Sequence, residues 1–165
     1  MSIPLAAVGA LVAALLETSV VPGITSVGKP DIVFVCTVVA TMMLSVEDGL
    51  TWAFLGGLMT DFLLPGRQLG ATSLALLMMA GAATLVARIF PQRRIVTTVL
   101  TVFGLSWVYQ ALTVLILSIT SGTPMALEPS VVLPSVVVDT VLAIPLAAVA
   151  RAAWMRFGAH DKIDW

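Results

Sequence analysis

The chain has 165 residues, of which 59% are hydrophobic and only 10% are charged, with a mean hydropathy of +1.09 and a formal net charge of −1. A soluble domain carries about 25% charged residues, so this composition predicts an all-α polytopic membrane protein with almost no soluble domain. The net charge leaves no basic face for nucleic acid. We therefore expect one membrane domain over residues 1–165, in contact with the lipid bilayer.

Six apolar stretches predict a six-transmembrane-helix bundle. They cover about residues 3–21, 32–46, 50–64, 71–90, 95–120 and 131–150, and a short tail follows over 151–165. The third stretch would measure roughly 22 Å at 1.5 Å per residue, which is short for a bilayer. Glu47-Asp48-Gly49 is expected to form the turn before it. The first stretch lacks the basic flank of a cleaved signal peptide, so we expect it to be a retained helix.

The loop charges predict an orientation. With six spans, six of the eight basic residues fall on the side of the two termini, and only Lys29 and Arg67 fall on the other side. The positive-inside rule then places both termini in the cytoplasm. The six residues on the predicted cytoplasmic side are Arg88, Arg93, Arg94, Arg151, Arg156 and Lys162.

Four polar residues interrupt the apolar stretches at mid to outer depth: Glu17, Asp61, Gln110 and Asp139. A carboxylate in lipid costs at least about 2.5–3.5 kcal/mol on insertion scales, so such residues are kept for packing or for function. One interpretation is a shared polar cavity that opens outward and binds a substrate or partner. The other is that each residue caps a neighbouring helix or pairs with a backbone group. The sequence leaves both interpretations open.

Small residues form faces on several predicted helices. Gly56 and Gly57 would let another backbone approach the third helix closely, as membrane helix interfaces require. Further small residues lie on the first helix (Ala6, Gly9, Ala10, Ala13 and Ala14), the fourth (Ala80-Gly81-Ala82-Ala83) and the sixth (Ala143, Ala147 and Ala148). Packing within the bundle needs such faces as much as partner binding does, and we favour packing within the bundle for each of them.

The sequence offers no catalytic constellation and no metal ligand set. His160 is the only histidine and lies in the tail, which excludes a histidine-based metal site or triad within the membrane. It contains no phosphate-binding glycine loop and no dinucleotide fingerprint. We therefore expect no enzyme activity and no cofactor.

A series of motifs resembles the MreD family of bacterial rod shape-determining membrane proteins over almost the whole chain. In order, these are a helix ending at Pro22, Lys29-Pro30-Asp31 before the second helix, Gly49 at a turn, Gly56-Gly57-Leu58 with Asp61, and Gly66 to Gly70 before the fourth helix. The chain departs from the pattern at Asp139, where many relatives are expected to carry a neutral amide, and at Glu17, where glutamine is common. No family role is carried over to those two positions.

The resemblance implies a non-enzymatic scaffold of the cell-elongation complex in the bacterial cytoplasmic (inner) membrane. Its partner would be an MreC-type single-span protein, through which it would be linked to MreB filaments, RodA and a class B penicillin-binding protein, with homo-oligomers formed through the complex. Pro30, Asp31, Gly56, Gly57, Asp61, Gly66 and Gly70 would be the partner-binding or structural residues.

The resemblance also implies a fold similar to the substrate-binding subunits (S-components) of energy-coupling-factor transporters. The alternative function is therefore vitamin or micronutrient capture for transport. A vitamin site would need several convergent polar or aromatic groups at the outer helix ends. The longest outer loop offers only Glu128 as a charge, which favours the scaffold.

Overall fold

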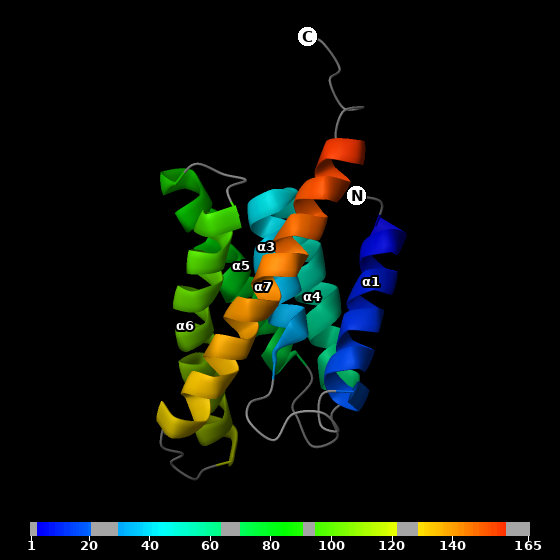
Figure 1. Ribbon diagram of the computed structural model, residues 1–165. Coiled ribbons are helices and arrows are strands. Elements are labelled where there is room, and N and C mark those ends of the chain that lie inside the picture. Colours follow the sequence, from blue (N-terminus) through cyan, green and yellow to red (C-terminus); the bar gives the residue numbers. More distant parts are fainter. Residues whose placement is uncertain (1–2, 21–29, 64–69, 91–94, 122–128, 158–165) are drawn as a thin grey trace.

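The computed structural model describes residues 3–20, 30–63, 70–90, 95–121 and 129–157, and these residues form helices and no strand. Figure 1 shows the helices running up and down in a bundle, with α1 beginning and α7 ending at the same end, called here the terminal end. α3, α5 and α7 begin at the opposite end, called here the far end. The elements are α1 (Ile3–Leu15), the π-helix η1 (Leu16–Val20), α3 (Ile32–Met43), α4 (Val46–Leu63), α5 (Ala71–Ile89), α6 (Ile95–Ser121) and α7 (Pro129–Phe157).

Three helices are long and apolar enough to cross a membrane by length and composition. The candidate spans are Ala71–Ile89, Ile95–Ile116 and Val132–Ala152, within α5, α6 and α7, and shorter apolar helices cover Val8–Thr18 and Ile32–Met43. α4 has the length of a span, but it carries Glu47, Asp48 and Asp61. The all-α prediction is confirmed for the described residues, and the count of six spans stays a prediction.

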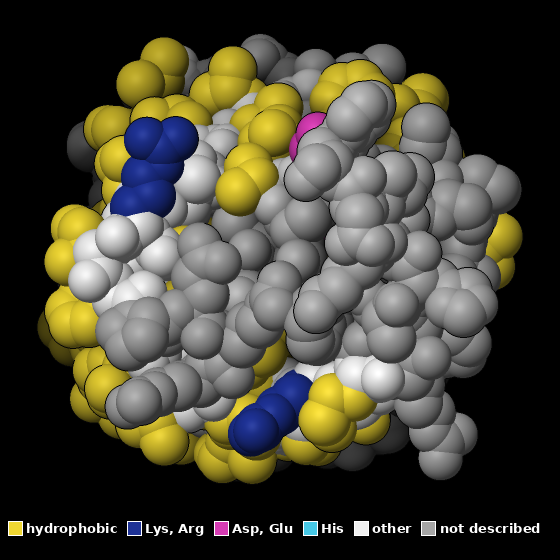
Figure 2. All heavy atoms as spheres, turned by 90° about the horizontal axis from the view of Figure 1, so that it is seen from above, with side chains coloured by type: hydrophobic (Ala, Val, Ile, Leu, Met, Phe, Trp, Pro, Cys, Tyr) yellow, Lys and Arg dark blue, Asp and Glu magenta, His cyan; other side chains and the backbone are white. Residues whose placement is uncertain are grey.

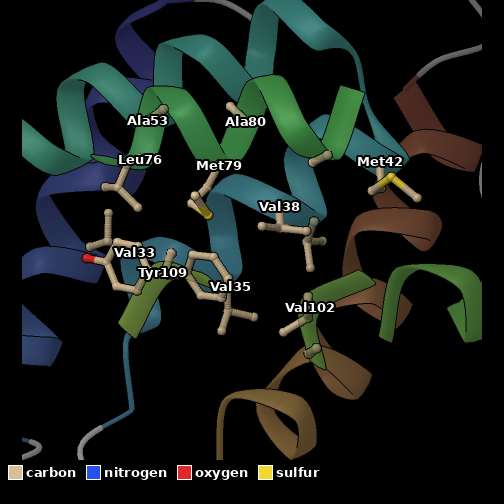
Figure 3. Packing of buried hydrophobic residues seen from close by; sticks show 14 of the residues in the cluster. Val33, Val35, Val38, Met42, Ala53, Leu76, Met79, Ala80, Val102 and Tyr109 are labelled. Atoms are coloured by element: carbon tan, nitrogen blue, oxygen red, sulfur yellow. The ribbon is translucent and has the colours of Figure 1, made fainter. Parts of the chain in front are cut away.

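α3 is the central helix of the bundle. It packs against α1, α4, α5, α6 and α7, and ten of its twelve residues are buried. The close view in Figure 3 shows its valines facing Leu76 and Met79 of α5 and Val102 of α6. The rings of Phe34 and Tyr109 stack with their centroids 4.8 Å apart. The apolar core therefore surrounds a helix whose side chains are almost all buried.

Large apolar side chains also cover the outside of the bundle. Leu85, Ile89 and Val149 are each more than 60% exposed. Such a surface matches lipid, whereas soluble monomers rarely expose wide apolar patches. Among the residues described here, the basic side chains are those of Arg88, in the last turn of α5, and Arg151, in α7. Figure 2 shows basic side chains on the face seen from the terminal end.

The glycine pair of α4 lies at close contacts between helices inside the bundle. A Cβ at Gly57 would fall on the backbone of Ser73 in α5, with the amide nitrogen 2.6 Å away, and a Cβ at Gly56 would collide with Val33 in α3. Most of the predicted small faces are likewise buried in the chain, among them Ala10, Ala13, Ala14, Ala80, Ala83, Ala143 and Ala147. Gly81 differs, because it is exposed and has open space at its Cβ position. Packing within the bundle therefore accounts for most of these small residues.

The turn between α3 and α4 lies earlier than the sequence predicted. It falls at Leu44 and Ser45, and Glu47-Asp48-Gly49 is the first turn of α4. Ser45 Oγ accepts a hydrogen bond from Asp48 N at 3.1 Å, which is an N-cap, and acidic residues in a first turn complement the helix dipole. Polarity alone predicts a loop at these charged residues. The N-cap at Ser45 explains why they belong to the helix instead.

The last helix also exceeds its predicted limits. α7 begins at Pro129 and ends at Phe157, so it continues into the segment that the sequence assigned to the tail. Pro134 and Pro145 lie inside it without ending it. Proline lacks only one N–H, and membrane helices tolerate it where neighbouring groups satisfy the freed carbonyl.

Candidate functional site

The start of α3 donates hydrogen bonds to carboxylates of two other helices, η1 and α7. The first N–H groups of a helix have no partner within the helix. Here Asp31 N donates to Asp139 Oδ1 at 2.9 Å, and Val33 N donates to Glu17 Oε2 at 3.0 Å. Asp139 lies ten residues after Pro129, which corresponds to a depth of about 15 Å along α7. Because α3 begins at this depth, its N–H groups need acceptors that the protein itself supplies.

Side chains from α6 extend this contact. Gln110 Nε2 donates to Asp31 Oδ2 at 2.9 Å, and Ser106 Oγ donates to Asp139 Oδ2 at 2.7 Å. Ser106 and Asp139 are both completely buried. We call Glu17, Asp31, Ser106, Gln110 and Asp139 the α3 junction. It joins η1, α3, α6 and α7.

Local structure explains how two of these residues take their places. Glu17 lies in the π-helix η1, where Thr18 Oγ1 donates to Ala14 O at 2.9 Å. Asp31 follows the buried Pro30, has the non-helical angles φ −92° and ψ 77°, and makes no side-chain cap to its own helix. Its carboxylate therefore accepts the hydrogen bond from Gln110, while carboxylates of other helices cap α3.

A second helix start is capped by Asp61. Asp61 Oδ2 accepts hydrogen bonds from Gly70 N at 2.8 Å and from Thr72 N at 3.3 Å. Gly70 has φ +93°, a conformation that glycine adopts without strain. Asp61 is 3% exposed, and its Oδ1 has no hydrogen-bond partner among the described residues. We call Asp61, Gly70 and Thr72 the α5 junction; Gly66 lies outside the described residues.

The predicted polar residues thus separate into two groups. Glu17, Gln110 and Asp139 meet around the start of α3 at Asp31, whereas Asp61 caps the start of α5. Each of the three carboxylates Glu17, Asp61 and Asp139 accepts a backbone N–H at a helix start. This geometry corresponds to the capping interpretation and gives the carboxylates a role in holding helices together.

Ser106 is a junction residue that the sequence interpretation missed. The signal was present, because Ser106 and Gln110 are four residues apart and lie on one face of a helix. Buried threonines give no such signal. Thr37, Thr41 and Thr60 each donate to the carbonyl four residues earlier in their own helix, so they need no partner elsewhere.

The junctions do not have the geometry of a metal centre. Within the ranges that the structure describes, no group of three His, Cys, Asp or Glu residues is placed to hold a metal ion. The oxygens of Asp139 face one backbone N–H and one hydroxyl. What this arrangement can do chemically is fix the positions of helices relative to one another.

An all-helical bundle with an apolar exterior and internally paired carboxylates defines the class of helical membrane proteins. Within this class, the family model described as rod shape-determining protein MreD matches residues 3–154. The chain therefore belongs to the MreD family, a family of shape-determining structural proteins, and its role is in rod-shape determination within the rod-shape complex. No curated protein and no solved structure matches the chain.

Proposed function

We propose that this protein is a non-enzymatic scaffold of a bacterial elongation complex that holds the membrane helix of an MreC-type single-span partner. Through that partner it would connect MreB filaments to peptidoglycan synthesis by RodA and a class B penicillin-binding protein. The family match supports the membership in the complex.

The observation that carries this proposal is that the deep carboxylates are engaged with backbone N–H groups of the same chain. Glu17, Asp61 and Asp139 cap helix starts. Most of the large side chains that the described helices expose are apolar, as at Leu85 of α5 and Val149 of α7. Helices associate in lipid through close packing supplemented by hydrogen bonds, so such faces suit a partner helix better than a water-soluble ligand.

The proposal includes an orientation in the inner membrane. We propose six membrane-spanning helices with both termini in the cytoplasm. Of the two described basic side chains, Arg88 lies in the last turn of α5 and Arg151 lies in the second half of α7, which ends at the terminal end, and this supports the positive-inside argument. Reporter fusions at Gln92 and Thr123 should report the cytoplasm and the outside respectively. Two fusions that report the same side would contradict this topology.

Co-purification in a mild detergent tests the function. We expect an MreC-type partner to co-purify with the protein, and we expect the complex to be lost when the partner's membrane segment is replaced by an unrelated apolar helix. Survival of the complex after that replacement would assign binding to the outer loops. It would contradict the proposal that the bundle binds the partner's membrane helix. Recovery of a transporter ATPase module in place of the MreC-type partner would support the vitamin-binding alternative.

Exposed glycines allow the partner-binding face to be mapped. None of the described residues lies within 4 Å of a Cβ built at Gly81 in α5 or at Gly104 in α6, so we expect leucine at either position to leave the bundle intact. A partner helix packed against one of these faces would be displaced by the added side chain. Gly81→Leu and Gly104→Leu therefore form a matched pair, and loss of the partner from one variant alone identifies the face.

A further inference from the structure

The two helices at the edges of the bundle are connected through the α3 junction. α1 packs on α4 and also on α3, whereas α7 packs on α6 and α3. Glu17 follows α1 directly, and Asp139 lies in α7. Their carboxylate oxygens accept from Val33 N, in the first turn of α3, and from Asp31 N, at the N-cap position of α3. The start of α3 thus donates one hydrogen bond to each of these two helices.

These two bonds depend on the same piece of backbone. The first turn of a helix frays easily, because its N–H groups have no partner within the helix. When one acceptor leaves, the turn is free to move and carries the other N–H away from its acceptor. Groups in one hydrogen-bond network therefore show coupled effects, whereas distant independent sites show additive effects.

The chemistry of the neighbouring groups adds to this dependence. Ser106 holds Asp139 from one side and Gln110 holds Asp31 from the other, so both ends of the Asp31–Asp139 contact are fixed to α6. Glu17, on the other side of the junction, lies in the π-helix η1. A π-helix is an irregular turn that often marks a functional site, and a change from π to α geometry there would rotate Glu17 away from Val33.

We propose that the α3 junction is a conformational coupling device that makes the positions of α1 and α7 depend on each other. In the bonded arrangement Glu17 and Asp139 both hold α3, and α1 and α7 keep a fixed separation. In the released arrangement the first turn of α3 opens, and both edge helices become free to shift. This proposal does not require the proposed partner, because it concerns the bundle alone.

A double-mutant cycle tests the coupling. Glu17→Ala, Asp139→Ala and the double variant are purified in the same detergent, and their thermal midpoints are compared with that of the unmodified protein. We expect the double variant to lose less than the sum of the two single losses, because the first substitution already releases the turn. Thr140→Val is the matched control, since the Thr140 hydroxyl donates to Val136 O within α7, and it should combine additively with Glu17→Ala. Additive losses for Glu17 and Asp139 would overturn the proposal.

A distance measurement tests the mechanical consequence. Spin labels at Val12→Cys in α1 and Val141→Cys in α7 occupy exposed positions, and Cys36→Ala removes the native thiol. We expect a narrow distance distribution that broadens or shifts both in Glu17→Ala and in Asp139→Ala, and that Thr140→Val leaves unchanged. A distribution that either alanine variant leaves unchanged would overturn the proposal.

Conservative variants keep the test decisive if an alanine variant does not fold. Glu17→Gln and Asp139→Asn each retain an oxygen that can accept the backbone N–H, and they should retain the narrow distribution. Ser106→Ala removes only the bond that orients Asp139 and should broaden the distribution partly. A Ser106→Ala protein with an unchanged distance distribution would contradict the coupling.

Discussion

The α3 junction and the α5 junction solve the same problem in different ways. Each supplies a carboxylate to the N–H groups of a helix that begins inside the bundle. At the α5 junction the acceptor and Gly70 N are nine positions apart in sequence, whereas Asp139 and Asp31 N are 108 positions apart. The α5 junction can form as soon as α4 and α5 meet, and the α3 junction forms only when α1, α6 and α7 are in place.

This difference shows that local and long-range contacts stabilise different levels of the structure. The local junction fixes a hairpin of two helices, and Gly57 lets the two backbones approach closely. The long-range junction fixes the arrangement of the whole bundle around α3. Substitutions in the two regions should therefore differ in kind: damage to the local junction weakens one hairpin, whereas damage to the α3 junction affects distant helices together.

The largest effect is expected from Gly57→Leu. The new side chain would meet the Ser73 backbone, which cannot move without separating α4 from α5. Overpacking usually costs about 1–3 kcal/mol, and backbone contact places this site at or above about 3 kcal/mol. The yield of monodisperse protein after detergent extraction should fall severely. Gly81→Leu is the control and should keep the normal yield, since its Cβ position is open. Equal yields from the two variants would contradict the packing described for α4 and α5.

Asp139→Ala should have the next largest effect. It leaves Asp31 N and the Ser106 hydroxyl without their acceptor inside the bundle, and each buried unsatisfied group costs about 1–3 kcal/mol. The thermal midpoint should fall clearly, and Asp139→Asn should recover most of the loss because one oxygen remains. If the asparagine variant were as unstable as the alanine variant, ionisation of Asp139 would matter more than hydrogen bonding.

Asp61→Ala should destabilise the protein less than Asp139→Ala. It removes a cap from α5, and loss of an N-cap costs about 0.5–2 kcal/mol. Asp61→Asn should keep both the stability and the partner complex, since the remaining oxygen can accept from Gly70 N. Loss of the complex in Asp61→Asn with unchanged stability would show that the charge of Asp61 acts in partner binding.

An effect of about the same size as that of Asp61→Ala is expected from Gly70→Ala. A left-handed conformation costs a residue with a side chain roughly 1–2 kcal/mol, although none of the described residues lies within 4 Å of the added Cβ. The thermal midpoint should fall by a similar amount while Asp61 continues to cap the helix. A large loss would indicate that the α5 junction is more constrained than its geometry suggests.

Local patterns carried most of what the sequence predicted correctly. Continuous apolar runs predicted an all-helical membrane protein, and the motifs from Lys29-Pro30-Asp31 to Gly70 predicted the family. The match over residues 3–154 confirms this resemblance. Gly57 and Asp61 were singled out because a glycine and a carboxylate are conspicuous in an apolar stretch, and both lie at the close contact between α4 and α5.

Long-range pairings could not be predicted in the same way. Glu17, Gln110 and Asp139 were recognised as polar residues at similar depth, but nothing in their spacing named Asp31 and Val33 as the groups that they meet. Such pairing depends on how deep α3 begins, and that depth follows from packing on all sides. The turn at Ser45 was predicted too late in the chain for a different reason. Its cap is a local signal, but the polarity of the residues that follow favoured a turn at those residues.

Amide-resolved hydrogen exchange at the start of α3 tests most directly whether the deep carboxylates serve the backbone of their own chain. The account predicts that Asp31 N and Val33 N are protected in the unmodified protein. It also predicts that Asp139→Ala and Glu17→Ala each expose both Asp31 N and Val33 N, while Gly70 N stays protected in both variants. Fast exchange of Asp31 N and Val33 N in the unmodified protein would contradict the account, because the carboxylates would then be free for another ligand.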